Sequence, residues 1–162
     1  MKFTFFEKNF LPFYHPIEIR DENDLIRYTL TRNQAAVGYK MHLLDPGEQE
    51  VALIRQKISL LTNKFTITTG GREILLVTKA NRREGFFFEF PEIGWKTTGN
   101  PSNEAYLLLS NGEQIAFIQR LPCADGKSCT VEYANVADEV LLLAAAIAIE
   151  AALAVIDGAD GD

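Results

Sequence analysis

Positive charge is scarce in this chain and is missing from its carboxy-terminal part. The 162 residues carry 16 Lys and Arg against 22 Asp and Glu, a formal net charge of -6, and no Lys or Arg follows Lys127. Nucleic-acid binders usually show a basic stripe, so this balance argues against DNA or RNA as a partner. It also disfavours adhesion to anionic lipid by net charge alone, but it leaves room for a local basic pocket.

Side chains that commonly carry chemistry are equally few. The chain has two histidines, His15 and His42, and two cysteines, Cys123 and Cys129. A nucleophile needs a base and an orienting third group, and the sequence offers no such set. We therefore expect no enzyme and no cofactor. Two thiols alone make an incomplete zinc site, so we also expect no metal. The cysteines are interpreted as reduced thiols, with a disulfide across a hairpin as the alternative.

The segment 1–16 lacks the pattern of a secretory signal. Its apolar residues are interrupted by Glu7, Lys8 and Asn9, and no small-residue cleavage site follows. This favours a reducing cytoplasm as the location, with peripheral attachment to a membrane if the ligand is a lipid. The length suits one domain, which we assign to residues 1–156, followed by an acidic tail at 157–162.

One long apolar run stands near the end of the chain. Between Val140 and Ile156 the only polar residue is Glu150. Acidic residues flank the run, and alanines fill much of it, so a core helix is favoured over transmembrane insertion. We expect a helix over 136–156, capped by Asn135 and ended at Gly158. Glu150 then needs a partner or a route to solvent, because an unpaired buried carboxylate is costly.

The rest of the chain consists of short β-rich segments separated by turn residues. Hairpins are indicated by IEIR with LIRYTL, VGYKMHLL with EVALIRQK, KFTITT with REILLVTK, and EAYLLLS with QIAFIQRL. KFTFFEK, GFFFEF, GWKTTG and SCTVEY bring the strand count to about twelve. GEQEVALIRQ and GEQIAFIQR share their turn and apolar order, which indicates a repeated hairpin. Together these patterns predict a mainly β fold, a closed antiparallel barrel of about twelve strands around a central hydrophobic C-terminal helix.

In this order, the segments resemble the LURP-one-related family, which belongs with the tubby C-terminal domains and the phospholipid scramblases. The resemblance rests on EVALIRQKISLLTNKFTI, GWKTTGN, YLLLSNGEQIAFIQR and DEVLLLAAAIAIEAAL. It implies a barrel of twelve strands around a hydrophobic C-terminal helix. Tubby relatives bind phosphoinositide headgroups, and scramblase relatives are tied to lipid movement. The calcium-binding segment and lipidated cysteines of scramblases are missing, and no Lys or Arg aligns with the tubby phosphate-binding pairs, so no residue role is carried over.

Basic residues gather in VTKANRRE, which contains Lys79, Arg82 and Arg83. Arginine suits bidentate phosphate contacts, so the cluster predicts a site for an anionic headgroup, with a solvated loop as the alternative. We therefore expect a non-catalytic binding or scaffold domain whose ligand is a phosphoinositide or another anionic lipid. The alternative is a protein-protein interaction module without a small ligand. The segment 86–90, FFFEF, is interpreted as a strand packed on both faces, with an exposed aromatic patch as the alternative.

Overall fold

A computed structural model describes residues 1–6, 16–33, 38–58, 63–81, 85–99, 101, 104–123, 126–134 and 138–160. These residues form twelve strands, one 3-10 turn and one α-helix. The elements are β1 (Lys2–Phe6), β2 (Ile17–Arg20), β3 (Ile26–Arg32), β4 (Lys40–Leu44), β5 (Glu50–Ile58), β6 (Asn63–Thr69), β7 (Arg72–Asn81), β8 (Gly85–Phe90), η1 (Pro91–Ile93), β9 (Trp95–Thr98), β10 (Ala105–Ser110), β11 (Glu113–Cys123), β12 (Gly126–Tyr133) and α1 (Glu139–Asp160).

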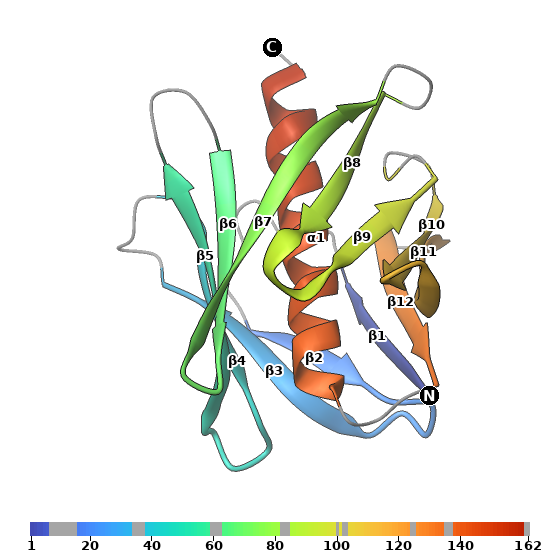
Figure 1. The fold of residues 1–162 in the computed structure, drawn as a ribbon. Helices are drawn as coiled ribbons and strands as arrows, with labels where there is room; N and C mark the ends of the chain where they lie inside the picture. Colours follow the sequence, from blue (N-terminus) through green and yellow to red (C-terminus); the bar gives the residue numbers. More distant parts are fainter. Residues whose placement is uncertain are drawn as a thin grey trace.

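The strands pair in sequence order to make one closed antiparallel barrel, and β1 closes it by pairing with both β12 and β2. The helix α1 runs through the barrel, and its C-terminal end lies at the end of the barrel where β7 ends and β8 begins (Figure 1). Closure leaves no long sheet edge open to solvent. The predicted fold class is therefore confirmed.

The core lies between the helix and the inward faces of the strands. Along β4, Met41 and Leu43 are buried and alternate with partly exposed neighbours, as a half-buried strand requires. Every residue of α1 from Leu142 to Leu153 is buried. The span Glu139–Ile156 has the length and composition of a membrane-crossing helix, and 67% of it is buried inside the barrel. Its alanines keep the helix thin, and the strands whose backbones lie closest to it are β5 and β6.

The helix boundaries differ from the prediction at both ends. The helix begins at Glu139 instead of residue 136, and the carbonyl of Asp138 accepts a hydrogen bond from the Leu142 N–H at 2.9 Å. Asn135, the predicted cap, lies outside the described residues. Gly158 was expected to end the helix, but the helix continues through it to Asp160. A single glycine costs a helix only about 1 kcal/mol, so it does not have to end one.

The two copies of the repeated motif form equivalent hairpins on opposite sides of the barrel. The hairpins β4–β5 and β10–β11 lie six places apart in the ring of twelve strands. Both have a register shift just before the turn. In each copy an alanine and an isoleucine face inward, and a longer polar side chain takes the next inward position. That position is Gln56 in β5 and Arg120 in β11.

Candidate functional site

The barrel interior contains a buried cluster of charged and polar side chains. The Arg120 Nε donates a hydrogen bond to Glu150 Oε2 at 2.9 Å, and the Tyr106 hydroxyl donates to Glu150 Oε1 at 2.7 Å. The side chains of Arg120 and Glu150 are only 8% and 2% exposed. A second Arg120 nitrogen donates to the carbonyl of Pro101. Both carboxylate oxygens are therefore satisfied, and Arg120 is the partner that Glu150 was expected to need.

Strand alternation brings these side chains together. Arg120 follows Ala116 and Ile118 on the inward face of β11, and Tyr106 faces inward from the neighbouring strand β10. The helix supplies Glu150 from the axis of the barrel. Sequence reasoning missed Arg120, although the same alternation that marks Ile118 as buried also marks the residue two positions further on.

Electrostatics keep Tyr106 in its neutral form. Burial raises the pKa of the Tyr106 hydroxyl well above its usual value, and the nearby Glu150 carboxylate raises it further. The protonated phenol is the form that can donate to Glu150. The guanidinium of Arg120 also lies 5.7 Å from the centroid of the Tyr106 ring. This closed, fully bonded arrangement fastens the helix to the wall and leaves no exposed group to meet a substrate.

The predicted headgroup cluster is only partly within the described residues. Lys79 lies near the end of β7 and is half exposed, and its Nζ is 2.7 Å from Glu89 Oε2 on β8. Arg82 and Arg83 lie outside the described residues. The structure therefore brings Lys79 together with a carboxylate and does not report how the two arginines are arranged.

The two cysteines lie on adjacent strands but are out of register. Cys123 is paired with Gly126, whereas Cys129 is paired with Arg120 and is fully buried. Three residues along a strand span roughly 10 Å. This exceeds the separation that a disulfide allows, so the hairpin disulfide held as an alternative is wrong.

Neither histidine belongs to a described catalytic arrangement. His42 lies on the outer wall, where its Nδ1 is hydrogen-bonded to Glu50 Oε1, and His15 lies outside the described residues. Within the part of the chain that the structure describes, no three His, Cys, Asp or Glu residues are grouped as metal ligands would be.

The aromatic segment on β8 packs as a strand. Phe88 and Phe90 are fully buried, and Phe86 meets Phe88 edge to face, with the ring centroids 5.6 Å apart. Phe90 also meets Trp95 edge to face at 6.5 Å. Phe87 points the other way and is partly exposed, beside Lys79 in the register of β7 and β8. Packing therefore accounts for most of this segment.

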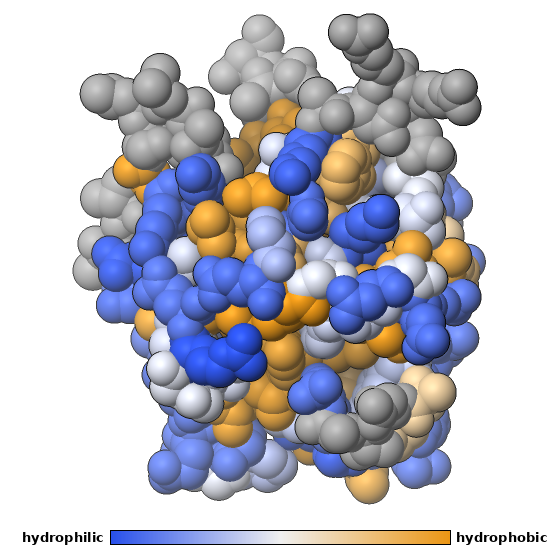
Figure 2. All heavy atoms as spheres, in the orientation of Figure 1, coloured by the Kyte–Doolittle hydropathy of each residue, from blue (hydrophilic) through white to orange (hydrophobic). Residues whose placement is uncertain are grey.

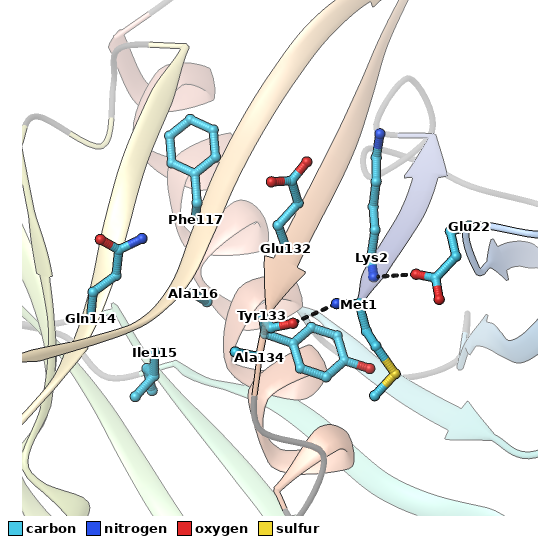
Figure 3. Close-up of a pocket in the computed structure, with 10 residues that line it drawn as sticks. All are labelled: Met1, Lys2, Glu22, Gln114, Ile115, Ala116, Phe117, Glu132, Tyr133 and Ala134. Atoms are coloured by element: carbon cyan, nitrogen blue, oxygen red, sulfur yellow. Dashed lines mark hydrogen bonds between the residues drawn. The ribbon is translucent and has the colours of Figure 1, made fainter.

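A hollow of about 580 Å³ lies where β12 ends beside β1 and β11 (Figure 3). Ile115 and Phe117 line it from β11, and Glu132 lines it from β12. The backbone N–H of Lys2 donates to Glu22 Oε2 at 2.8 Å across its rim. The hollow is open and mixed in polarity, and it resembles an ordinary surface depression more than a shaped ligand pocket.

A second hollow of about 410 Å³ lies between the β6–β7 hairpin and the first turn of α1. Val140 and Leu141 line it from the helix, and Arg72 and Glu139 supply opposite charges at its border. Figure 2 shows hydrophobic atoms in the lower middle of this face, bordered by hydrophilic side chains. Asp138 also lines the hollow, so its border carries two carboxylates against one guanidinium and does not favour an anionic ligand.

These features define a closed, twelve-stranded antiparallel barrel that is fastened to its central helix by a buried Arg–Glu–Tyr cluster. Comparisons of the chain with protein-family models, with curated proteins and with solved structures gave no match in any of the three.

Proposed function

We propose that this protein is a non-catalytic binding domain for an anionic headgroup, that of a phosphoinositide or another anionic lipid. The headgroup is taken up at the end of the barrel where β7 ends and β8 begins. The observation that supports the proposal most is the filled interior, because the helix occupies the barrel from Leu142 to Leu153. The buried carboxylate of Glu150 is already bonded to Arg120 and Tyr106. This supports a ligand site on the outer surface of the barrel.

The predicted basic cluster supplies the charge that such a ligand needs. Lys79 is 52% exposed on the outer wall, and its partner Glu89 is 27% exposed. Exposed ion pairs of this kind are worth only about 0–1 kcal/mol. A phosphate group carries up to two negative charges and can take Lys79 from Glu89, with Arg82 and Arg83 next along the chain. A cytoplasmic protein of this kind attaches peripherally to the membrane surface.

The test is co-sedimentation with phosphatidylcholine vesicles, with and without a phosphoinositide. We expect the unaltered protein to sediment only with the phosphoinositide vesicles. The variant with Lys79→Ala, Arg82→Ala and Arg83→Ala should lose this binding, and its melting temperature should hardly change because exposed substitutions usually cost less than about 0.5 kcal/mol.

A matched control removes three cations from the opposite end of the barrel: Lys2→Ala, Arg27→Ala and Arg72→Ala. The control variant should bind as the unaltered protein does. Binding that survives the change at Lys79, Arg82 and Arg83 excludes this cluster as the site.

If the unaltered protein sediments with neither kind of vesicle, the result favours the alternative function, a protein-protein interaction module. Leu25 and Ile26, whose exposed fractions are 61% and 43%, are then the first surface to test.

A further inference from the structure

Four basic side chains outside the Lys79 cluster gather on the outer wall of three neighbouring strands, β4, β5 and β6 (Figure 1). We call this group the basic wall, and its members are Lys40, Arg55, Lys57 and Lys64. The buried residues next to them in sequence, Met41, Ile54 and Phe65, face the core, so strand alternation turns the four cations outward. The two cations on β5 are exposed and the other two are partly exposed.

The cations of the basic wall lie opposite one another in two cross-strand pairs. Lys40 is opposite Arg55 in the register of β4 and β5. Lys57 is opposite Lys64 in the register of β5 and β6. Directly opposite side chains have Cβ atoms about 5 Å apart, and like charges at this spacing destabilise a sheet.

Carboxylates do little to relieve this repulsion. Among the described residues, Lys40, Arg55 and Lys64 form no ion pair. The Lys57 Nζ lies 2.7 Å from Glu73 Oε1 on β7, but both side chains of this pair are 54% exposed, and exposed ion pairs are weak. The wall therefore keeps an excess of positive charge in a chain whose formal net charge is -6.

The repeated hairpin shows that the fold does not require these charges. The hairpin β10–β11 has the same inward alanine and isoleucine as β4–β5, but its outward residues at the matching positions are neutral. Gln119 takes the place of Arg55 in the repeated sequence. The residue opposite Gln119 is Ala105, where the other hairpin has Lys40. Because the two hairpins share a core and differ in outer charge, the cations indicate a role outside the barrel.

We propose that the basic wall binds an acidic segment of a partner protein in an extended conformation. Alternate side chains of an extended chain point the same way about 7 Å apart, which is also the spacing of Arg55 and Lys57 along β5. A segment with Asp or Glu at every second position that lies along β5 therefore presents one carboxylate to each pair of cations. Each carboxylate relieves the repulsion within a pair, and the Arg55 guanidinium can donate two hydrogen bonds to one of them.

Other polyanions fit the wall less well. The net charge of -6 disfavours a nucleic acid, whose binders usually carry a basic surplus. Arg55 lies three residues before the end of β5, roughly 10 Å down the side of the barrel. A membrane that meets the barrel end at Lys79 does not lie along this side. The basic wall shares no residue with the Lys79 cluster and does not depend on it.

The test is fluorescence anisotropy of a labelled synthetic peptide in which Glu and Ser alternate, titrated with the full chain at low salt. We expect saturable binding that weakens as salt is added, because exposed charges are screened. A peptide of the same composition with all its Glu residues in one block should bind more weakly, since its carboxylates point to both sides of an extended chain.

The informative variant is Lys40→Ala, Arg55→Gln, which gives β4–β5 the neutral residues of β10–β11. It should bind the alternating peptide about tenfold more weakly, because it removes one cation pair. Its melting temperature should equal or exceed that of the unaltered protein, since a repulsive pair is gone. The matched control, Lys2→Ala, Lys96→Gln, removes the same charge from β1 and β9 and should bind as the unaltered protein does.

Three results would overturn the proposal: no binding of the alternating peptide, equal binding of the alternating and block peptides, or equal losses in the two variants. Vesicles separate it from the headgroup site. Lys40→Ala, Arg55→Gln should still sediment with phosphoinositide vesicles, and the variant altered at Lys79, Arg82 and Arg83 should still bind the peptide. If Lys40→Ala, Arg55→Gln loses the vesicles and the unaltered protein ignores the peptide, the basic wall is a membrane surface and the proposal is wrong.

Discussion

Arg120 on β11 and Glu150 on α1 form a buried ion pair, with 2.9 Å between Nε and Oε2. Together with the hydrogen bond from Tyr106 on β10, it joins Glu150 of the central helix to the barrel wall. A buried ion pair gains little over a well-packed apolar pair, because both charges lose their hydration. Its specific value is geometric, since one carboxylate on a nearly uniform apolar helix can fix how that helix is rotated and how deeply it sits.

Breaking this pair from one side should be far more damaging than removing both sides. Arg120→Met leaves the Glu150 carboxylate buried without its cation, so we expect a loss of roughly 3–5 kcal/mol in the free energy of unfolding. The double variant Arg120→Met, Glu150→Leu should lose much less than the sum of the two single changes. Urea unfolding of the four proteins measures this. Single variants within about 1 kcal/mol of the parent would show that the pair is not structural.

Alkaline pH should destabilise the protein through its buried tyrosines. Burial raises the pKa of the Tyr106 hydroxyl well above its usual value, and Glu150 raises it further. Above about pH 10 the unfolded chain therefore loses a proton that the folded protein keeps. The unfolded state then binds fewer protons, so stability falls as pH rises, by up to about 1.4 kcal/mol per pH unit for each such tyrosine.

Urea unfolding between about pH 9 and 12 checks this, with Tyr106→Phe as the comparison. The variant should be less stable at neutral pH, because Glu150 loses a donor, but its stability should fall less steeply above about pH 10. Parallel slopes for the two proteins would show that Tyr106 ionises alike in the folded and unfolded states.

The alanines of α1 should tolerate no enlargement. Ala145 and Ala148 are fully buried between the helix and the barrel wall. Replacing either with leucine should cost roughly 1–3 kcal/mol, because the space is already filled. The exposed Ala134 is the matched control, and Ala134→Leu should be nearly neutral. In the other direction, Ile147→Ala or Leu153→Ala should cost about 2–5 kcal/mol. Enlarged variants as stable as the parent would mean that the helix is not enclosed.

The barrel and its helix could be predicted from sequence because each depends on local pattern. Alternation and turn residues mark all twelve strands, and a run of apolar residues interrupted only by Glu150 requires cover on every side. The end of the helix was misplaced because Gly158 has a strong preference for helix ends but only a small cost inside one.

The partners of the buried side chains could not be predicted in the same way. Arg120 and Glu150 are 30 residues apart, and only closure of the barrel brings them together. The sequence around Tyr39 indicates only an aromatic residue beside a strand. That its buried hydroxyl has no hydrogen-bond partner becomes apparent only in the folded structure. The Lys79 cluster was found by composition, which cannot show that Glu89 on the next strand pairs with Lys79.

Native-state hydrogen exchange of the α1 amides is the most direct test of a barrel folded around its helix. If the helix is the core, the amides from Leu143 to Ala151 should exchange only through global unfolding. Their free energies of exchange should then equal those of the most protected amides of β5 and β6, the strands whose backbones lie closest to the helix. Helix amides that exchange orders of magnitude faster than those strand amides would contradict this, because the barrel would then persist without its helix.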